Sequence, residues 1–166
     1  KVTNGIAKKI ANQVMPGNDI HGGFASHIVV PSSGLCVVDE PGALENQCLR
    51  DSECTLAELS VLADAVTTPY QAIERSGLAA GDLAIVIGLG GVGGFCAQIA
   101  AAQGATVVGI DINEERLALM EKYGVSKTFH SKSEDARAIK KELRSWAAER
   151  GLPRTGWKIF ECSGAG

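Results

Sequence analysis

A glycine-rich turn is the part of this sequence whose residue types and spacing point most directly to chemistry. Its six residues are Gly88-Leu89-Gly90-Gly91-Val92-Gly93, and they stand between a short apolar run and a helical pattern. Gly88 permits a tight turn, Gly90 lets a pyrophosphate approach the backbone, and Gly93 lets a helix pack closely on the preceding strand. Free N–H groups and the positive helix end would then face the anion. The sequence therefore predicts a pyrophosphate site, with Gly91 in the same turn.

An acidic and a basic residue follow the turn at positions suited to a nucleoside. Asp111 ends the next apolar run, 18 residues after Gly93, which is near the roughly 20 expected for an acid that binds a ribose. Its carboxylate would accept hydrogen bonds from the ribose hydroxyls and repel a 2′-phosphate, so we predict NAD rather than NADP. Arg116 either lies along the adenosine or is a solvated surface charge. The alternative for the whole motif is a glycine-rich turn of no function in an ordinary α/β domain.

The elements that must position these residues alternate between strand and helix patterns. Strands are predicted at 83–87, 106–110, 125–129 and 157–160. A glycine turn with a helix is predicted over 88–103, and further helices at 114–123 and 133–150. The first two strands are apolar runs too short for helices, as is typical of strands buried on both faces. This order predicts right-handed parallel crossovers and an α/β, doubly wound sheet. Because a complete sheet of this type has six strands, we expect a piece of a longer polypeptide with four of them.

The first third of the chain has a different character. Residues 1–54 are rich in turn-forming residues, and the segment 23–30 has the pattern of a strand, so this part is predicted to be β-rich. Residues 55–58, Thr-Leu-Ala-Glu, have the form of a helix capping box. Two helices, or one helix kinked at Pro69, should follow and end before Gly77.

Composition excludes several classes of protein. The chain has 166 residues, of which 45% are hydrophobic and 21% charged, a composition that disfavours disorder over most of its length. A net charge of −3 with no basic run disfavours nucleic-acid binding. The longest stretch without polar side chains, residues 83–97, is too short for a membrane helix. No leader can be read after Lys1, which favours the cytoplasm. Five cysteines without a CxxC pair are predicted to be reduced thiols: Cys36, Cys48, Cys54, Cys96 and Cys162.

Three segments resemble the medium-chain, zinc-type alcohol dehydrogenases, which join a GroES-like catalytic domain to a Rossmann domain. These segments are 22–31 (GGFASHIVVP), 88–93 (GLGGVG) and 160–164 (FECSG). The resemblance runs from about Met15 to Gly164. It implies that residues 1–63 are part of a GroES-like, β-rich catalytic domain, and that residues 64–166 are part of a Rossmann NAD-binding domain.

The resemblance also implies roles for single residues. Asp64 falls where the family places its last catalytic zinc ligand, Thr68 where a hydroxyl meets the nicotinamide, and Val92 where an apolar side chain backs that ring. A carboxylate is an acceptable zinc ligand, and a short acid within an apolar helix needs a strong partner to be buried. Alternatively, Asp64 is a helix-end acid bonded to backbone or solvent, and Thr68 caps the segment before Pro69. The family's other catalytic ligands precede the region represented here, and residues 1–14 contain none of the four cysteines of its structural zinc site.

The implied activity is NAD-dependent oxidation of a secondary alcohol to a ketone by hydride transfer, with a zinc ion lowering the pKa of the alcohol. Residues 15–18, 63–72 and 156–161 resemble a narrower group of the family that acts on a cyclic alcohol carried as a CoA thioester, in anaerobic aromatic degradation. An acyl-CoA alcohol and a homo-oligomer, dimer or tetramer, follow from the resemblance. The alternatives are a zinc-independent relative that reduces an activated alkene, and a nucleotide-binding fragment without turnover.

Overall fold

The structure is a computed structural model, and it describes residues 16–32, 35, 54–55, 57–132 and 135–164. The chain divides into two compact units, residues 1–53 and 54–166, and each is described by itself. The domain boundary expected after residue 63 falls inside the second unit and stays a prediction.

The described part of the first unit consists of turns and irregular chain. The strand predicted at 23–30 is wrong, because these residues form bends without strand pairing. Phe24 and Val29 are almost fully exposed. A strand pattern becomes a strand only where a neighbour satisfies its backbone hydrogen bonds, and the described residues supply no such neighbour here. The other predictions for this unit, including those for Cys36 and Cys48, lie outside the described residues.

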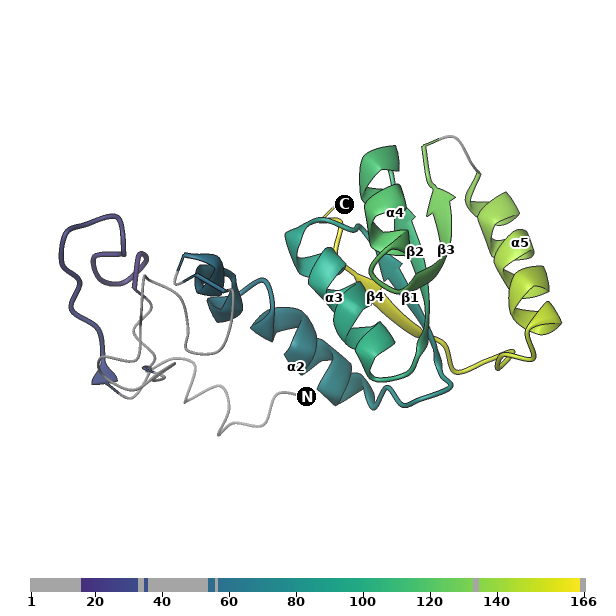
Figure 1. The fold of residues 1–166 in the computed structure, drawn as a ribbon, viewed down its shortest axis with the longest axis horizontal. Helices are drawn as coiled ribbons and strands as arrows, with labels where there is room; N and C mark the ends of the chain where they lie inside the picture. Colours follow the sequence, from purple (N-terminus) through teal and green to yellow (C-terminus); the bar gives the residue numbers. More distant parts are fainter. Residues whose placement is uncertain (1–15, 33–34, 36–53, 56, 133–134, 165–166) are drawn as a thin grey trace. The chain divides into compact units, whose positions relative to one another are not determined.

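Four parallel strands form one sheet in the second unit (Figure 1). They are β1 (Leu83–Ile87), β2 (Thr106–Asp111), β3 (Val125–His130) and β4 (Lys158–Glu161). Their order is β3-β2-β1-β4, so the chain crosses from one edge of the sheet to the other between β3 and β4. In the centre, Ile85 is paired with both Val108 and Ile159. The predicted α/β fold with a parallel sheet is confirmed, and each strand lies within one residue of its predicted bounds.

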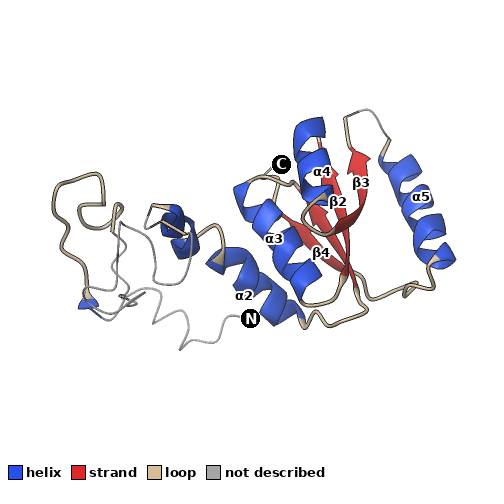
Figure 2. Cartoon of the chain, in the orientation of Figure 1, coloured by secondary structure: helices blue, strands red, loops and turns tan. Residues whose placement is uncertain are grey.

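Helices cover both faces of this sheet (Figure 2). They are α2 (Thr67–Ser76), α3 (Gly91–Ala102), α4 (Glu114–Glu121) and α5 (Ala136–Glu149). Ala84 and Val86 pack in one core with α2, α3 and α4, whereas Leu83 and Ile85 pack with α5 on the opposite face. Successive strand residues point to opposite faces, so the continuous apolar run of β1 fills both cores. Among the described helices, none has the length and apolar character needed to cross a bilayer.

A capping box begins the helical part of the second unit. The N–H and the hydroxyl of Thr55 donate to the Glu58 carboxylate at 2.7 and 2.8 Å, and the Glu58 N–H donates to the Thr55 hydroxyl at 3.2 Å. This is the predicted reciprocal cap. The segment that follows is a short 3-10 helix, η2 (Glu58–Ala63), and α2 begins separately after it. Two helices therefore form, and Pro69 lies in the first turn of α2, where its missing N–H is harmless.

A hydrogen bond connects strand β4 to helix α2. The Lys158 ammonium donates a hydrogen bond to the Ser76 carbonyl oxygen at 2.8 Å, across 82 residues of sequence. Ser76 is the last residue of α2, and Gly77 ends that helix with a φ of 64°, as predicted. Cationic side chains are favoured at helix carboxyl ends. The contact therefore holds the end of α2 against β4.

Candidate functional site

A cavity of about 440 Å³ opens at the carboxyl ends of β1, β2 and β4. In parallel α/β sheets, ligands bind at this edge, near the point where the strand order reverses. That point lies here between β1 and β4. Gly88, Gly90, Asp111 and Arg116, all selected from the sequence, line the cavity. The other lining residues are Ile87, Ile110, Ile112, Ser131, Glu161, Cys162 and Ser163.

Close packing fixes two glycines of the turn. Gly88 has a φ of 83°, in the left-handed region that favours glycine, and a Cβ there would lie 2.6 Å from the Cα of Ser163. A Cβ at Gly93 would lie 1.7 Å from the Gly88 carbonyl oxygen and 3.1 Å from the Cβ of Cys162. The absence of a side chain at Gly88 lets the chain bend beside β4, and its absence at Gly93 lets α3 approach the turn. This geometry agrees with the tight turn predicted at Gly88 and with the close helix packing predicted at Gly93.

The backbone between these two glycines is open. The nearest atom to a Cβ built at Gly90 is an Arg116 guanidinium nitrogen at 3.9 Å, and nothing lies within 4 Å of one built at Gly91. Helix α3 begins at Gly91, and the first N–H groups of a helix have no partner within it. The opening thus combines the positive end of α3 with the guanidinium of Arg116. Both features fit an anionic group lying over Gly90.

Asp111 is buried, with 5% of its surface exposed, and it anchors the turn. Its carboxylate accepts the Leu89 N–H at 2.5 Å and the Asn113 N–H at 2.9 Å. Hydrogen bonds to charged groups stabilise by about 1.5–3 kcal/mol each. An ionised carboxylate has about four acceptor positions, so capacity remains for ribose hydroxyls in the cavity. The ribose contact was predicted from the sequence, but the bond from Leu89, which joins residues 22 positions apart, was not.

An acidic residue at the end of β4 also lines the cavity and was not predicted as a site residue from the sequence. The Glu161 carboxylate accepts the Ser163 hydroxyl at 2.5 Å and the Ser163 N–H at 2.7 Å. The hydroxyl bond, followed by the N–H bond, holds the pKa of Glu161 below its usual 4.5. These bonds shape the bend that brings Ser163 against Gly88. The signal in the sequence was position alone, because residues just after a parallel strand are placed at the ligand edge.

Two residues that the resemblance assigned to catalysis contact each other and do not line this cavity. The Thr68 hydroxyl donates to the Asp64 carboxylate at 2.6 Å, and the Thr68 N–H donates to the Asp64 carbonyl at 2.9 Å. The expectation that Asp64 is buried within an apolar helix is wrong, since η2 ends at Ala63 and both side chains are exposed. Val92, in α3, is partly buried and also does not line the cavity. The roles of Asp64, Thr68 and Val92 stay predictions.

The described residues do not form a zinc site by themselves. Across the described ranges, no group of three or more His, Cys, Asp or Glu side chains is placed to hold a metal ion. Protein zinc sites use three or four such ligands. If Asp64 is a zinc ligand, the described residues do not supply the other ligands that such a site needs.

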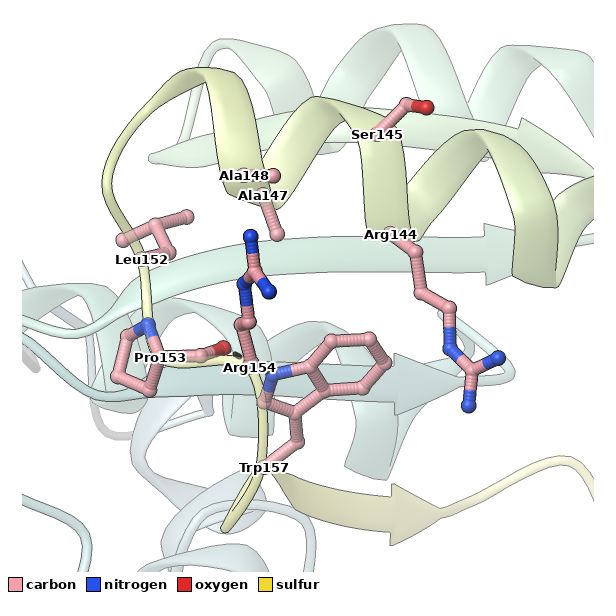
Figure 3. A pocket seen from close by; sticks show the side chains of 8 residues that line it. All are labelled: Arg144, Ser145, Ala147, Ala148, Leu152, Pro153, Arg154 and Trp157. Carbon is pink, nitrogen blue, oxygen red and sulfur yellow. Dashed lines mark hydrogen bonds between the residues drawn. The ribbon is translucent and has the colours of Figure 1, made fainter.

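A second cavity, also of about 440 Å³, lies beside the carboxyl end of α5 (Figure 3). Arg144, Arg154 and Trp157 line it, and the Trp157 indole N–H donates to the Pro153 carbonyl at 2.6 Å. Because residues 152–157 directly precede β4, this cavity opens at the amino end of that strand. Ligands of parallel sheets bind at the opposite edge, so the candidate site is the first cavity.

Comparison with known sequences identifies relatives of this chain. Residues 91–166 match the family described as zinc-binding dehydrogenase. An alcohol dehydrogenase of Moraxella sp. (strain TAE123) is 26% identical over 133 residues, which are 80% of this chain and 36% of that protein. An alcohol dehydrogenase of Geobacillus stearothermophilus is 33% identical over 69 residues, which are 42% of this chain and 20% of that protein. The chain thus spans about a third or less of these relatives.

Solved structures show the same relationship. Galactitol-1-phosphate dehydrogenase from Escherichia coli matches 90% of this chain and 38% of its own, with a TM-score of 0.67 and 28% identity. The alcohol dehydrogenase of Aeropyrum pernix matches 84% of this chain and 38% of its own, with a TM-score of 0.63 and 26% identity. Together, the fold, the glycine turn and these similarities relate the chain to the medium-chain, zinc-binding alcohol dehydrogenases.

Proposed function

We propose that this chain carries the NAD-binding part of an alcohol dehydrogenase that oxidises a secondary alcohol to a ketone. The observation that carries the proposal is the open backbone at Gly90, in a turn anchored by Asp111, at the carboxyl edge of a parallel sheet. This arrangement offers hydrogen-bond donors to a diphosphate and an acceptor to a ribose within one cavity. Relatives that are alcohol dehydrogenases support the reaction class.

Residues that line the cavity and residues outside it have separate roles in this proposal. The N–H groups at the start of α3, with Arg116 beside them, would hold the diphosphate over Gly90. Asp111 would accept the hydroxyls of the adenosine ribose. Thr68 and Val92 would contact the nicotinamide, as the resemblance implies. When bound, NAD supplies the carbon that accepts hydride from the alcohol.

The charge of Asp111 favours NAD over NADP. The carboxylate is buried and accepts two backbone N–H groups, so it is held at the cavity, where it would repel a 2′-phosphate. Arg116 is the one cation among the described residues that line the cavity, and it opposes this preference. Direct measurement of both nucleotides therefore decides between the two effects.

We also propose that the protein binds the catalytic zinc implied by the resemblance, and Asp64 is the one residue of this chain proposed as a ligand. Its carboxylate is exposed and already bonded to a hydroxyl, a geometry compatible with a ligand but not specific to one. We expect the protein to contain zinc and Asp64→Asn to contain less, by elemental analysis. Asp82→Asn is the control, since Asp82 accepts a backbone N–H in the loop before β1. Zinc-free protein that reduces an activated alkene would favour the zinc-independent alternative.

The proposed substrate is 6-hydroxycyclohex-1-ene-1-carbonyl-CoA, and the product is its 6-oxo thioester. The support is the resemblance of residues 15–18, 63–72 and 156–161 to the dehydrogenase of this compound. CoA carries several phosphates, which basic side chains normally bind. We further propose a homo-oligomer, dimer or tetramer. Turnover of this thioester, compared with simple secondary alcohols, tests the substrate directly.

Nucleotide titration tests whether the protein binds NAD, which the proposed function requires. NADH and NADPH are titrated separately into the protein, and their fluorescence reports binding. We expect NADH to bind more tightly, and Asp111→Ala to reduce the difference between the two dissociation constants. Asp82→Ala, which loses a comparable backbone contact to Ala79 at 3.0 Å, should keep that difference. Folded protein that binds neither nucleotide would refute the proposal.

A further inference from the structure

The second cavity, beside the carboxyl end of α5, has a wall that the backbone fixes. Gly151 has a φ of 67°, and its N–H donates to the Ala148 carbonyl at 3.1 Å. The Leu152 N–H donates to the Ala147 carbonyl at 3.0 Å. These two bonds form a Schellman cap, which ends the helix and uses two of its last carbonyl groups. Leu152 packs against the core on the α5 face of the sheet, so the chain is held where it leaves α5.

Trp157 is a second fixed part of the lining. Its indole N–H donates to the Pro153 carbonyl at 2.6 Å, and its side chain packs against the same core as Leu152. Because the N–H already has a partner, the ring itself is the group that Trp157 offers to a ligand. Aromatic rings pair favourably with other aromatic rings. The cavity thus presents a preorganised surface to a planar ring.

The charged groups among the described lining residues are two guanidinium groups, those of Arg144 and Arg154. Figure 3 shows the Trp157 indole between these two side chains. Across the described ranges, no carboxylate forms an ion pair with either arginine, and none of the lining residues is acidic. Glu142, on the same helix as Arg144, pairs instead with Lys127 at 2.7 Å. The lining is therefore positively charged.

We propose that the second cavity binds a small aromatic anion, a planar ring that carries a carboxylate or a phosphate group. Guanidinium groups bind both of these oxyanions through charge-assisted, often bidentate hydrogen bonds. The ring would lie against Trp157, and Ala147 and Leu152 supply apolar contacts. The volume of about 440 Å³ falls within the range of small-molecule sites, roughly 300–1,000 Å³.

Other classes of ligand fit this lining less well. A metal cation would meet two guanidinium groups and no carboxylate. A nucleic acid is bound by many basic contacts along its backbone, whereas this chain has a net charge of −3. The carboxyl end of a helix repels anions, but the Schellman cap already supplies donors to two of the carbonyl groups at that end. A small anion is thus the ligand that the lining favours.

This site is separate from the nucleotide cavity. The two cavities share no lining residue, and they lie at opposite ends of β4. The anion site therefore does not depend on the proposed function, and both cavities can be occupied at once.

Tryptophan fluorescence of the whole protein measures the binding. The chain has two tryptophans, Trp146 and Trp157, and Trp146 is buried. Benzoate and phenyl phosphate are titrated separately, with benzamide as the neutral analogue and cyclohexanecarboxylate as the saturated one. We expect the aromatic anions to bind more tightly than benzamide by about tenfold, and benzoate more tightly than cyclohexanecarboxylate by roughly two- to tenfold. The fluorescence change should disappear in Trp157→Phe.

Arginine variants locate the contacts to the anion. Arg144→Gln and Arg154→Gln should each raise the dissociation constants of benzoate and phenyl phosphate about tenfold. Arg150→Gln is the matched control, because Arg150 lies at the same end of α5, stacks on the Trp146 ring at 4.6 Å from its centroid and does not line the cavity. It removes the same charge and should leave both constants unchanged. Circular dichroism shows whether each variant is folded.

The titrations are repeated with saturating NAD+, which should not change the dissociation constants. Loss of anion binding in the presence of NAD+ would place the anions in the nucleotide cavity and overturn the proposal. Equal affinity for benzoate and benzamide would also overturn it, as would an equal effect of Arg150→Gln and the two lining variants. Protein that binds NAD+ but neither anion refutes this site alone, whereas protein that binds the anions but not NAD+ refutes the proposed function alone.

Discussion

Substitution of Gly93 by alanine tests whether direct contact holds α3 against the turn. The new Cβ would lie 1.7 Å from the Gly88 carbonyl oxygen, 2.9 Å from its carbonyl carbon and 3.1 Å from the Cys162 Cβ. Side-chain Cβ atoms essentially never come closer than 3.0 Å to such neighbours, so the start of α3 must move by more than 1 Å. Overpacking of this kind destabilises by about 1–3 kcal/mol.

Gly91→Ala is the matched control for stability. Gly91 lies in the same turn of α3, but its Cβ would meet nothing within 4 Å and its φ is not positive. Alanine is more favourable than glycine in a helix by about 0.5–1 kcal/mol, so this variant should be at least as stable as the wild type.

Urea unfolding followed by far-ultraviolet circular dichroism measures the difference. At an unchanged slope, the midpoint should fall for Gly93→Ala and not for Gly91→Ala. NADH titration of Gly93→Ala should show a dissociation constant roughly ten- to hundredfold higher. A wild-type midpoint and wild-type affinity in Gly93→Ala would refute the packing argument. An equal fall in both variants would show that any side chain in this turn is destabilising.

Three further outcomes are expected. Asp111→Ala leaves the N–H groups of Leu89 and Asn113 without their carboxylate, so the nucleotide-free protein should lose about 2–3 kcal/mol in urea unfolding; an effect on affinity alone would contradict the anchoring role. Asn113→Ala removes the side-chain cap of α4 and should cost about 1 kcal/mol in thermal unfolding, whereas an unchanged melting temperature would show the cap to be dispensable. The N–H and hydroxyl of Thr55 lower the pKa of Glu58 below 4.5, so its stabilisation is present above pH 4.5 and is lost as the pH falls through the folded-state pKa. Glu58→Gln should flatten this acid-side dependence of stability, and a Glu58 pKa at or above 4.5 by NMR would contradict the assignment.

Much of the second unit could be predicted because its signals are local. The run 83–87 is apolar at every position, which is typical of a strand covered on both faces, and both faces are covered. Glycines that follow a helical pattern predicted where helices end, as Gly77 does for α2. By contrast, the strand predicted at 23–30 failed because the pattern carries no information on whether a partner strand is available.

The candidate site was predictable only where its residues are close in sequence. Spacing alone identified the glycine turn and Asp111. The bond from Leu89 to Asp111 arises because parallel crossovers bring separate strand ends together, and no local pattern encodes it. Asp64 was expected to be buried because its neighbours are apolar, but η2 ends before it and leaves it exposed.

The strand order β3-β2-β1-β4 has a consequence for synthesis of the protein. One edge of β1 can pair only when β4, the last of the described strands, has left the ribosome. About 70 residues separate the two strands, which corresponds to roughly 4–14 s at translation rates of about 5–20 residues per second. During that interval β1 presents an unpaired apolar edge, a template for aggregation. We therefore expect nascent or truncated chains that stop before Lys158 to aggregate unless chaperones bind them.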